Sequence, residues 1–320
     1  YFFIKMNSEH ILSIQGVTKR YAKHTAIENI SIDIPKNKIF GLLGPNGAGK
    51  TSLIRIINQI TAPDEGQILF NGSPLTLSHE SKIGYLPEER GLYKKMKVGE
   101  QALYLARLKG LSKSKAMELL KFWFEKFEIT TWWDKKIEEL SKGMQQKVQF
   151  IVTVLHEPEL LILDEPFSGF DPINAALIRN EILRLKENGT TIVLSTHNMS
   201  SVEEICDDIA LIYKSKKILD GSVKQVKEDR KQNIYNVSYL GDKMKFSQAL
   251  WIDAELIESE VDGKLQTAKV KLLNNKTPND LLKALIPHVE IHALHEEVPS
   301  MNDVFIQRVN EINKEMEVIS

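Results

Sequence analysis

The 320-residue sequence has little of three features that would each point to a particular environment or partner. Its one cysteine, Cys206, excludes an internal disulfide and a cysteine-rich metal site, and fits a reducing cytosol. No run approaches eighteen consecutive apolar residues, so we expect the chain not to span a membrane by itself. The net charge of -1 gives no overall attraction to nucleic acid or anionic lipid. The opening YFFIKM has neither an initiator methionine nor a signal-peptide hydrophobic region, so we expect the residues before Met6 to be a remnant of expression.

The stretch GLLGPNGAGKTS completes the pattern G-x-x-x-x-G-K-[ST] with Gly44, Gly49, Lys50 and Thr51. A loop of this kind turns several backbone N–H groups toward one concavity that suits a phosphate chain. The helix predicted from Lys50 adds the positive end of its dipole. We expect Lys50 to reach the β and γ phosphates of a nucleotide and Thr51 to bind Mg²⁺. A chance glycine-rich turn is the alternative, and the strand–loop–helix context argues against it.

Strands and helices alternate over the first two thirds of the chain. The apolar runs IFGLLG, QILFNG, LLILDEP, TIVLSTH and IALIY, separated by amphipathic helices, predict a mostly parallel α/β sheet with helices on both faces. Ligands of such sheets gather at the carboxyl ends of the strands, where Gly44, Asp164 and His197 fall. Residues 92 to about 158 look helical, and their apolar stripe over residues 119–127 is predicted to be core.

Two acids, Asp164 and Glu165, follow the apolar run LLIL. A phosphate-bound Mg²⁺ would explain this pair, because Asp164 could hold the ion directly or through water, opposite Thr51. Glu165 would then reach a water in line with the γ-phosphate and act as a general base. A capped strand end with solvated acids is the alternative, and it is hard to reconcile with an intact phosphate loop.

The segments LSKGMQQKVQF and LLILDEPFSGFD resemble the signature motif, second nucleotide-binding motif and D-loop of ATP-binding cassette (ABC) ATPases, in the family's order. The resemblance covers residues 10 to about 222. It implies a P-loop NTPase fold of ABC type with an antiparallel N-terminal β subdomain and a helical subdomain at about 92–158. We therefore expect an ABC ATP-binding domain over residues 8–222 that hydrolyses ATP and uses Mg²⁺.

The resemblance also assigns roles by position. Tyr21 matches the aromatic residue that stacks on adenine, and His197 matches the switch histidine that contacts the γ-phosphate. Lys50, Glu165 and His197 would carry catalysis, while Thr51, Glu88 and Asp164 would hold the metal. The remaining expected nucleotide contacts come from the phosphate loop and the D-loop: Gly44, Pro45, Asn46, Gly47, Ala48, Gly49, Lys50, Thr51, Ser52, Ser168 and Asp171.

The signature motif suggests a second anion site. Ser141 begins a predicted helix, and with Gly143 it would offer a hydroxyl, backbone N–H groups and a positive dipole end. In the family this surface faces the γ-phosphate held by another protomer, so the resemblance implies two ATP molecules sandwiched in a head-to-tail dimer, with a homodimer expected. Closing and opening of the dimer would drive a separate multi-spanning membrane permease, which places the chain peripherally on the cytoplasmic face of the cell membrane. No nucleic-acid partner is expected.

Two positions depart from the family pattern. Glu88, in GYLPEERG, stands where the family usually has glutamine; a glutamate can also ligate Mg²⁺, and it adds negative charge near the γ-phosphate. The signature reads LSKGM instead of the commoner LSGGQ, so Lys142 and Met144 replace glycine and glutamine. Because Ser141 and Gly143 remain, we expect a functional site.

The pattern changes after the linker VKQVKEDRKQN, and we expect residues 223–320 to form a small separate α+β domain. Thr277 should cap a helix with Pro278 at its first position, and Ser300 with Asp303 forms a capping box. The cluster HALHEE favours surface histidines over a metal site, because further ligands at a recognisable spacing are missing. Together with GYLPEERGLY, the segment VPSMNDVFIQRV resembles bacterial ABC exporter ATPases of the sodium-efflux and related subgroup, which carry an extra C-terminal domain.

The preferred function is therefore the energy-coupling ATPase of a membrane exporter. The alternative is a soluble ABC ATPase that acts as a switch on ribosomes or DNA. Such proteins usually join two cassettes or interrupt theirs with long coiled coils or zinc modules, and neither feature occurs in this sequence. A P-loop kinase would account for neither LSKGM nor the D-loop.

Overall fold

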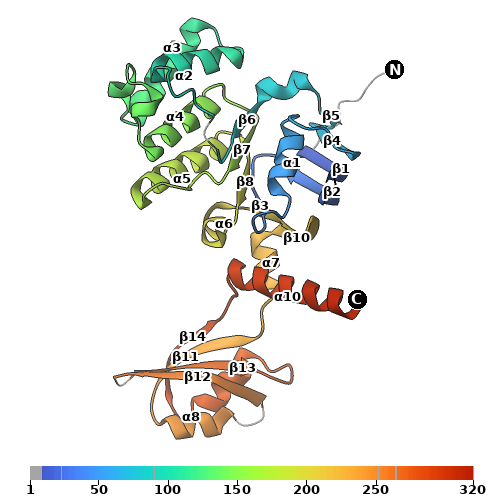
Figure 1. The fold of residues 1–320 in the computed structure, drawn as a ribbon. Helices are drawn as coiled ribbons and strands as arrows, with labels where there is room; N and C mark the ends of the chain where they lie inside the picture. The colour runs from blue at the N-terminus through green and yellow to red at the C-terminus, as the bar shows by residue number, and fades with distance from the viewer. Residues whose placement is uncertain (1–8, 23, 90, 251–252, 264, 320) are drawn as a thin grey trace. The chain divides into compact units, whose positions relative to one another are not determined.

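The computed structural model describes residues 9–22, 24–89, 91–250, 253–263 and 265–319. The residues before Met6, expected to be a remnant of expression, lie outside this part. Contacts divide the chain into two compact units, the first made of Tyr1–Val223 and Arg308–Ser320 and the second of Lys224–Gln307 (Figure 1). In the described part of the chain, every helix is too short or too polar to cross a bilayer.

A six-stranded sheet forms the centre of the first unit, with strand order β10-β9-β3-β8-β7-β6. All neighbouring pairs are parallel except β9 with β10. Strands β3, β7 and β8 are buried along their whole lengths, as expected for a sheet covered on both faces. The strands are β3 (Ile39–Leu43), β6 (Ile83–Leu86), β7 (Leu160–Asp164), β8 (Thr191–Thr196), β9 (Asp208–Tyr213) and β10 (Lys216–Ser222).

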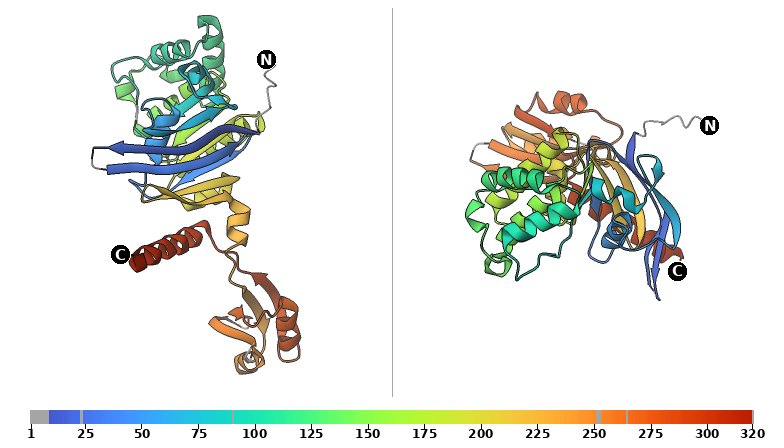
Figure 2. Two further views of the ribbon diagram at one scale, coloured as in Figure 1. Left: turned by 90° about the vertical axis from the view of Figure 1, so that its right-hand side faces the viewer. Right: turned by 90° about the horizontal axis from the view of Figure 1, so that it is seen from above.

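An antiparallel sheet of order β2-β1-β4-β5 adjoins it. Its strands are β1 (His10–Tyr21), β2 (His24–Pro35), β4 (Glu65–Phe70) and β5 (Ser73–Pro74), and β1 and β2 form the long blue ribbon in the left view of Figure 2. The run QILFNG contributes to β4, so its predicted place in the parallel sheet is wrong. The reason is its one-sided burial: Ile68 and Phe70 are buried while Gln67 is exposed, the pattern of a strand with only one covered face. The edge of the parallel sheet is instead β6, which the sequence analysis missed.

Helix α1 (Lys50–Ile57) lies between the two sheets, since its apolar side chains join buried side chains of both in one core. Two more helices follow strands of the parallel sheet, α5 (Pro172–Glu187) and α6 (Met199–Ile205). This order of strands and helices confirms the predicted α/β class with an antiparallel N-terminal sheet.

The predicted helical segment contains α2 (Val98–Leu108), α3 (Lys113–Lys126) and α4 (Lys142–Val154). Short 3₁₀ turns occur at Leu77–Lys82 before it and at Thr130–Trp132 and Ile137–Glu139 within it. Its apolar stripe is confirmed as core: Trp123 and Phe127 of α3 are buried, and both rings pack against Phe150 of α4 with centroids 6.5 and 5.9 Å away. The aromatic contacts therefore join α3 to α4.

The second unit has an antiparallel sheet of order β12-β13-β11-β14 with α8 and α9 packed into one apolar core. Thr277 is confirmed as the N-cap of α9, where it also forms a capping box with Asp280, and the predicted capping box of Ser300 with Asp303 is confirmed at α10. The two histidines of HALHEE are exposed on β14. The elements from Val223 onward are α7 (Val223–Glu228), β11 (Ile234–Leu240), α8 (Lys243–Leu250), β12 (Ala254–Asp262), β13 (Leu265–Leu272), α9 (Pro278–Leu285), β14 (Glu290–Glu296) and α10 (Met301–Ile319), whose residues from Arg308 belong to the first unit.

Candidate active site

A cavity of about 240 Å³ lies where β3 and β7 end, bounded also by the tip of the β1–β2 hairpin. Ten of the predicted site residues line it: Tyr21, Asn46, Gly47, Gly49, Lys50, Thr51, Ser52, Glu88, Asp164 and Glu165. Two further lining residues, His24 and Ala26, were missed. Their nearness to Tyr21 in YAKHTA was the only signal that could have found them, because β1 turns back into β2 within three residues.

Two glycines of the phosphate loop are required by close backbone packing. A Cβ atom on Gly44, whose φ is +147°, would lie 2.2 Å from the carbonyl oxygen of Ile212. On Gly49, with φ +115°, it would lie 2.3 Å from the carbonyl oxygen of Ala26. Gly47 differs: its φ is +78°, but no other atom lies within 4 Å of the Cβ position. The loop is therefore packed tightly on the protein side and open on the cavity side.

The N-terminus of α1 points its unpaired groups at this cavity. The helix starts at Lys50, and its N-cap, Gly49, has no side chain to accept from the first N–H groups. The first turn contains no acidic residue that would neutralise the positive end of the dipole. The hydroxyls of Thr51 and Ser52 line the same space. This arrangement fits a phosphate chain, for which backbone N–H groups and a helix N-terminus are natural partners.

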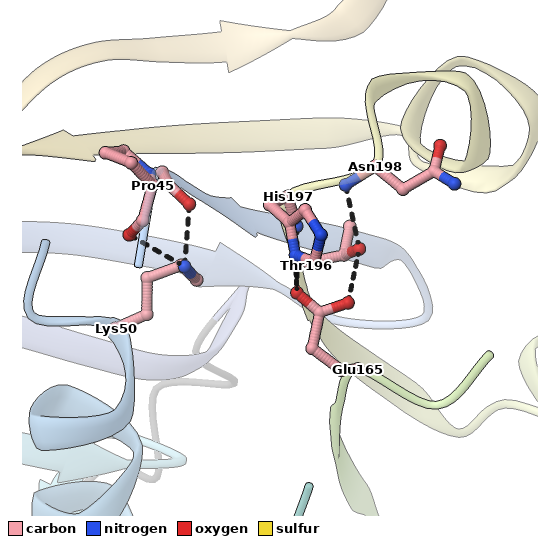
Figure 3. Close-up of polar contacts among 7 residues, drawn as sticks. Pro45, Lys50, Glu165, Thr196, His197 and Asn198 are labelled. Atoms are coloured by element: carbon pink, nitrogen blue, oxygen red, sulfur yellow. Dashed lines mark hydrogen bonds and ion pairs between the residues drawn. The ribbon is translucent and has the colours of Figure 1, made fainter. Parts of the chain in front are cut away.

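The Lys50 side chain folds back across its own loop. It is 7% exposed, and its Nζ donates to the carbonyl oxygens of Gly44, at 2.6 Å, and Pro45, at 3.2 Å (Figure 3). Burial lowers the pKa of Lys50, while the carboxylates of Glu165, Asp164 and Glu88 act in the opposite direction. The loop thus holds a buried positive charge at the edge of a cavity that contains three acids.

Asp164 is almost completely buried at the end of β7, 3% exposed. Burial raises its pKa, the Ser195 side chain lowers it, the neighbouring carboxylates of Glu88 and Glu165 raise it, and Lys50 lowers it. A divalent cation would relieve this concentration of negative charge, and carboxylate and hydroxyl oxygens are the ligands that Mg²⁺ prefers. Asp164, Glu88 and the Thr51 hydroxyl, all lining the cavity, fit such an ion.

Glu165 has a left-handed backbone conformation, φ +49°, which is uncommon for a residue other than glycine and occurs often at functional sites. Its carboxylate accepts hydrogen bonds from the backbone N–H of His197 and the hydroxyl of Thr196, each at 3.0 Å (Figure 3). The Nδ1 atom of the His197 ring lies 2.5 Å from the same carboxylate. The predicted base and the predicted switch histidine, which directly follow β7 and β8, are therefore in direct contact.

Seven predicted nucleotide contacts do not line this cavity: Gly44, Pro45 and Ala48 of the phosphate loop, and Ser141, Gly143, Ser168 and Asp171. Ser141 is the N-cap of α4, where its hydroxyl accepts from the N–H of Met144 at 3.3 Å. Asp171 caps α5 by accepting from the first N–H groups of that helix. Ser168 is exposed, and a Cβ on Gly143 would meet only Phe170 and Gly169, at 3.7 Å or more. The N-terminus of α4, capped by Ser141, therefore lies apart from the cavity.

Comparison with family profiles gives two matches. The profile of the family described as "ABC transporter" matches residues 27–168. The profile described as "ATP-binding protein DrrA1-3-like, C-terminal domain" matches residues 221–309.

Individual relatives extend this likeness over the whole chain. An uncharacterized ABC transporter ATP-binding protein, YhaQ, of Bacillus subtilis is 42% identical over 303 residues, covering 94% of this chain and 99% of that protein. The bacitracin transport ATP-binding protein BcrA of Enterococcus faecalis is 36% identical over 242 residues, covering 73% of this chain and 76% of that protein. A solved structure of the ATP-binding subunit of an ABC transporter superposes with a TM-score of 0.64 at 28% identity, over 68% of this chain and 92% of that one.

Proposed function

Because the chain belongs to the family of ABC transporter ATP-binding proteins, the ATPases of these transporters, we propose that it binds two ATP molecules in a head-to-tail dimer and powers export through a separate permease. The observation that supports the dimer is that the two candidate phosphate sites, the cavity and the N-terminus of α4, are separate. The residues proposed to hold one phosphate chain and its metal line the cavity, while Ser141 and Gly143 do not. A second nucleotide, held by a second chain, would give these residues a ligand.

A differential contact makes such a dimer depend on ATP. The N-terminus of α4 offers the hydroxyl of Ser141 and the positive end of the helix dipole to a γ-phosphate of the partner chain. Only contacts that exist in the closed state and are missing from the open state can shift the equilibrium toward closure. ADP lacks the γ-phosphate, so hydrolysis would remove this contact and release the dimer.

Within each cavity we assign the steps to the residues in contact there. Lys50 would turn from its two carbonyl partners to the β and γ phosphates, and Tyr21, which is 40% exposed, would stack on adenine. Mg²⁺, held by Thr51, Asp164 and Glu88, would neutralise charge on the phosphate oxygens. Glu165 would accept a proton from the attacking water, and His197 would orient its carboxylate.

The test is the variant Glu165→Gln. It keeps the shape of the side chain and can still form hydrogen bonds, but it cannot accept the proton. We expect ATP binding to persist and turnover to fall at least about 100-fold, the usual contribution of a general base. A dimer should then accumulate in ATP and Mg²⁺ and be visible by size-exclusion chromatography, with the same variant in ADP as the monomeric control. Turnover equal to that of the wild type would refute the assignment of the base.

Export and the membrane partner are supported by the relatives. BcrA is named for bacitracin transport, and ABC ATPase subunits act together with membrane permeases. We place the chain on the cytoplasmic face of the membrane, while the resemblance to sodium-efflux subunits stays a prediction. Co-purification from membranes with a multi-spanning protein is the expected result. Sedimentation with ribosomes instead would favour the alternative of a soluble switch.

We also propose that the C-terminal region, residues 223–320, supports dimerisation or regulation. The end of α10 is itself part of the first unit, where Arg308 donates to the carbonyl oxygen of Ile218 at 3.0 Å and Asn313 accepts from Tyr213 at 3.2 Å. Deletion from residue 223 onward should therefore change ATPase activity or dimerisation. Unchanged values of both would remove this role.

A further inference from the structure

Helix α4 makes one buried polar contact with the segment that carries Glu165. Gln146 is 9% exposed, and its Nε2 donates to the carbonyl oxygen of Pro166, the residue after Glu165, at 3.1 Å. Its other polar atom, Oε1, is buried with no partner among the described residues. A half-satisfied buried amide costs free energy that methionine or leucine would avoid. The hydrogen bond to Pro166 is the interaction of the Gln146 amide that can offset this cost.

The contact adds to bonds that hold this segment to β8, where the backbone N–H of Glu165 donates to the carbonyl oxygen of Ser195 at 2.9 Å. Between the end of β7 and the start of α5, the segment turns through the left-handed Glu165 and two local backbone bonds, from Ser168 to Glu165 and from Phe170 to Phe167. The same segment meets α4 a second time, because Phe170 lies beside Gly143. Gly143 and Gln146 are three positions apart and therefore share one face of the helix.

Gln146 thus connects two functional parts of the same chain. At one end of the connection is the first turn of α4, capped by Ser141. At the other end is the backbone beside Glu165, whose carboxylate contacts His197. A small movement of α4 would be transmitted through the amide to the position of the base, and a misplacement of about 1 Å can change a rate by roughly a hundredfold.

We propose that Gln146 is a positioning residue, which holds Glu165 in its working place only while α4 is in its docked position. The inference rests on the proposed function, in which a γ-phosphate of the partner chain binds at Ser141. Binding of that phosphate at Ser141 docks α4, and α4 then positions Glu165 of the same chain.

Gln146→Met tests this proposal, because it keeps the length of the side chain and removes the donor. Nucleotide affinity of the isolated chain depends on the Lys50 cavity and should stay within about twofold of the wild type. The kcat for ATP should fall by roughly tenfold or more, with KM little changed, since the base is misplaced while ATP contacts remain. Removing the unpaired Oε1 compensates for the lost bond, so the midpoint of urea unfolding should hardly move.

Thr153→Val is the matched control. Thr153 is also buried on α4, 8% exposed, but its hydroxyl bonds the carbonyl oxygen of Gln149 in the same helix. It should keep the wild-type kcat. Gln146→Leu serves as the second variant if the methionine variant folds poorly, and it should show the same loss of kcat.

Several outcomes would overturn the assignment: a wild-type kcat in both Gln146 variants, a fall matched by weaker nucleotide binding, or an equal fall in Thr153→Val. The dimer trapped by Glu165→Gln separates this result from the proposed function. If that dimer forms in ATP while Gln146→Met turns over normally, only the positioning role fails. If that dimer does not form, the proposed function fails first.

Discussion

Two glycines of the phosphate loop should respond differently to the same substitution. Gly44→Ala places a methyl group 2.2 Å from the carbonyl oxygen of Ile212, a backbone atom of β9 that cannot turn away as a side chain could. Gly47→Ala places its methyl group where nothing lies within 4 Å. Both residues have positive φ, +147° and +78°, so both variants carry backbone strain. Only the first also forces the loop and the sheet apart.

The expected magnitudes follow from these contacts. Left-handed strain alone costs about 1–2 kcal/mol, which is the expected loss of unfolding free energy for Gly47→Ala. Gly44→Ala adds the displacement of the β9 backbone, and we expect a loss of roughly 3 kcal/mol or more. Alanine also restricts the unfolded chain, but this gain is the same in both variants and cancels in the comparison. The difference between them should therefore be about 2 kcal/mol.

Relative to the loss of unfolding free energy, the loss of ATP affinity should be larger for Gly47→Ala than for Gly44→Ala. The methyl group of Gly47→Ala projects into the open side of the cavity, where the phosphates are expected, and should weaken ATP binding at least tenfold, or about 1.4 kcal/mol. Guanidinium unfolding without nucleotide, followed by tryptophan fluorescence, measures stability, and calorimetric titration with ATP measures affinity. Equal losses of stability in the two variants, or wild-type affinity in Gly47→Ala, would refute the reasoning.

Three further substitutions test other parts of the chain. Ser141→Ala removes the hydroxyl of the proposed second anion site, so ATPase activity should fall clearly; unchanged turnover would count against that site. Glu88→Gln removes one of three cavity carboxylates, so half-maximal activity should need several-fold more Mg²⁺, and a metal titration that gives the wild-type value would exclude Glu88 as a ligand. Thr277→Ala breaks the capping box with Asp280 and should destabilise α9 by about 1 kcal/mol. Hydrogen exchange over residues 278–285 would reveal this as faster exchange, with α1 as an internal reference, and equal protection would contradict it.

Predictions from the sequence were correct for features that depend only on residues close together in the chain. The capping box at Thr277 is contained in four residues, and the buried stripe of α3 follows from helical spacing alone. QILFNG was placed in the wrong sheet because a short segment can indicate a strand but does not indicate which strand it pairs with. Whether β4 pairs with β1 or joins the parallel strands depends on contacts some fifty residues away, such as Leu12 with Phe70.

The phosphate loop, the acid pair after β7 and the cap of α4 were determined by the sequence itself, since each needs only the backbone geometry of a few adjacent residues. The tertiary structure alone decided which of them meet. It brought His24 and Ala26 into the cavity, joined Glu165 to His197 across neighbouring strands and tied Gln146 to Pro166, twenty residues further along the chain. It also left Ser141 outside the cavity. Such meetings arise from the packing of whole sheets and helices, whose register and order are set by long-range burial that no short motif contains.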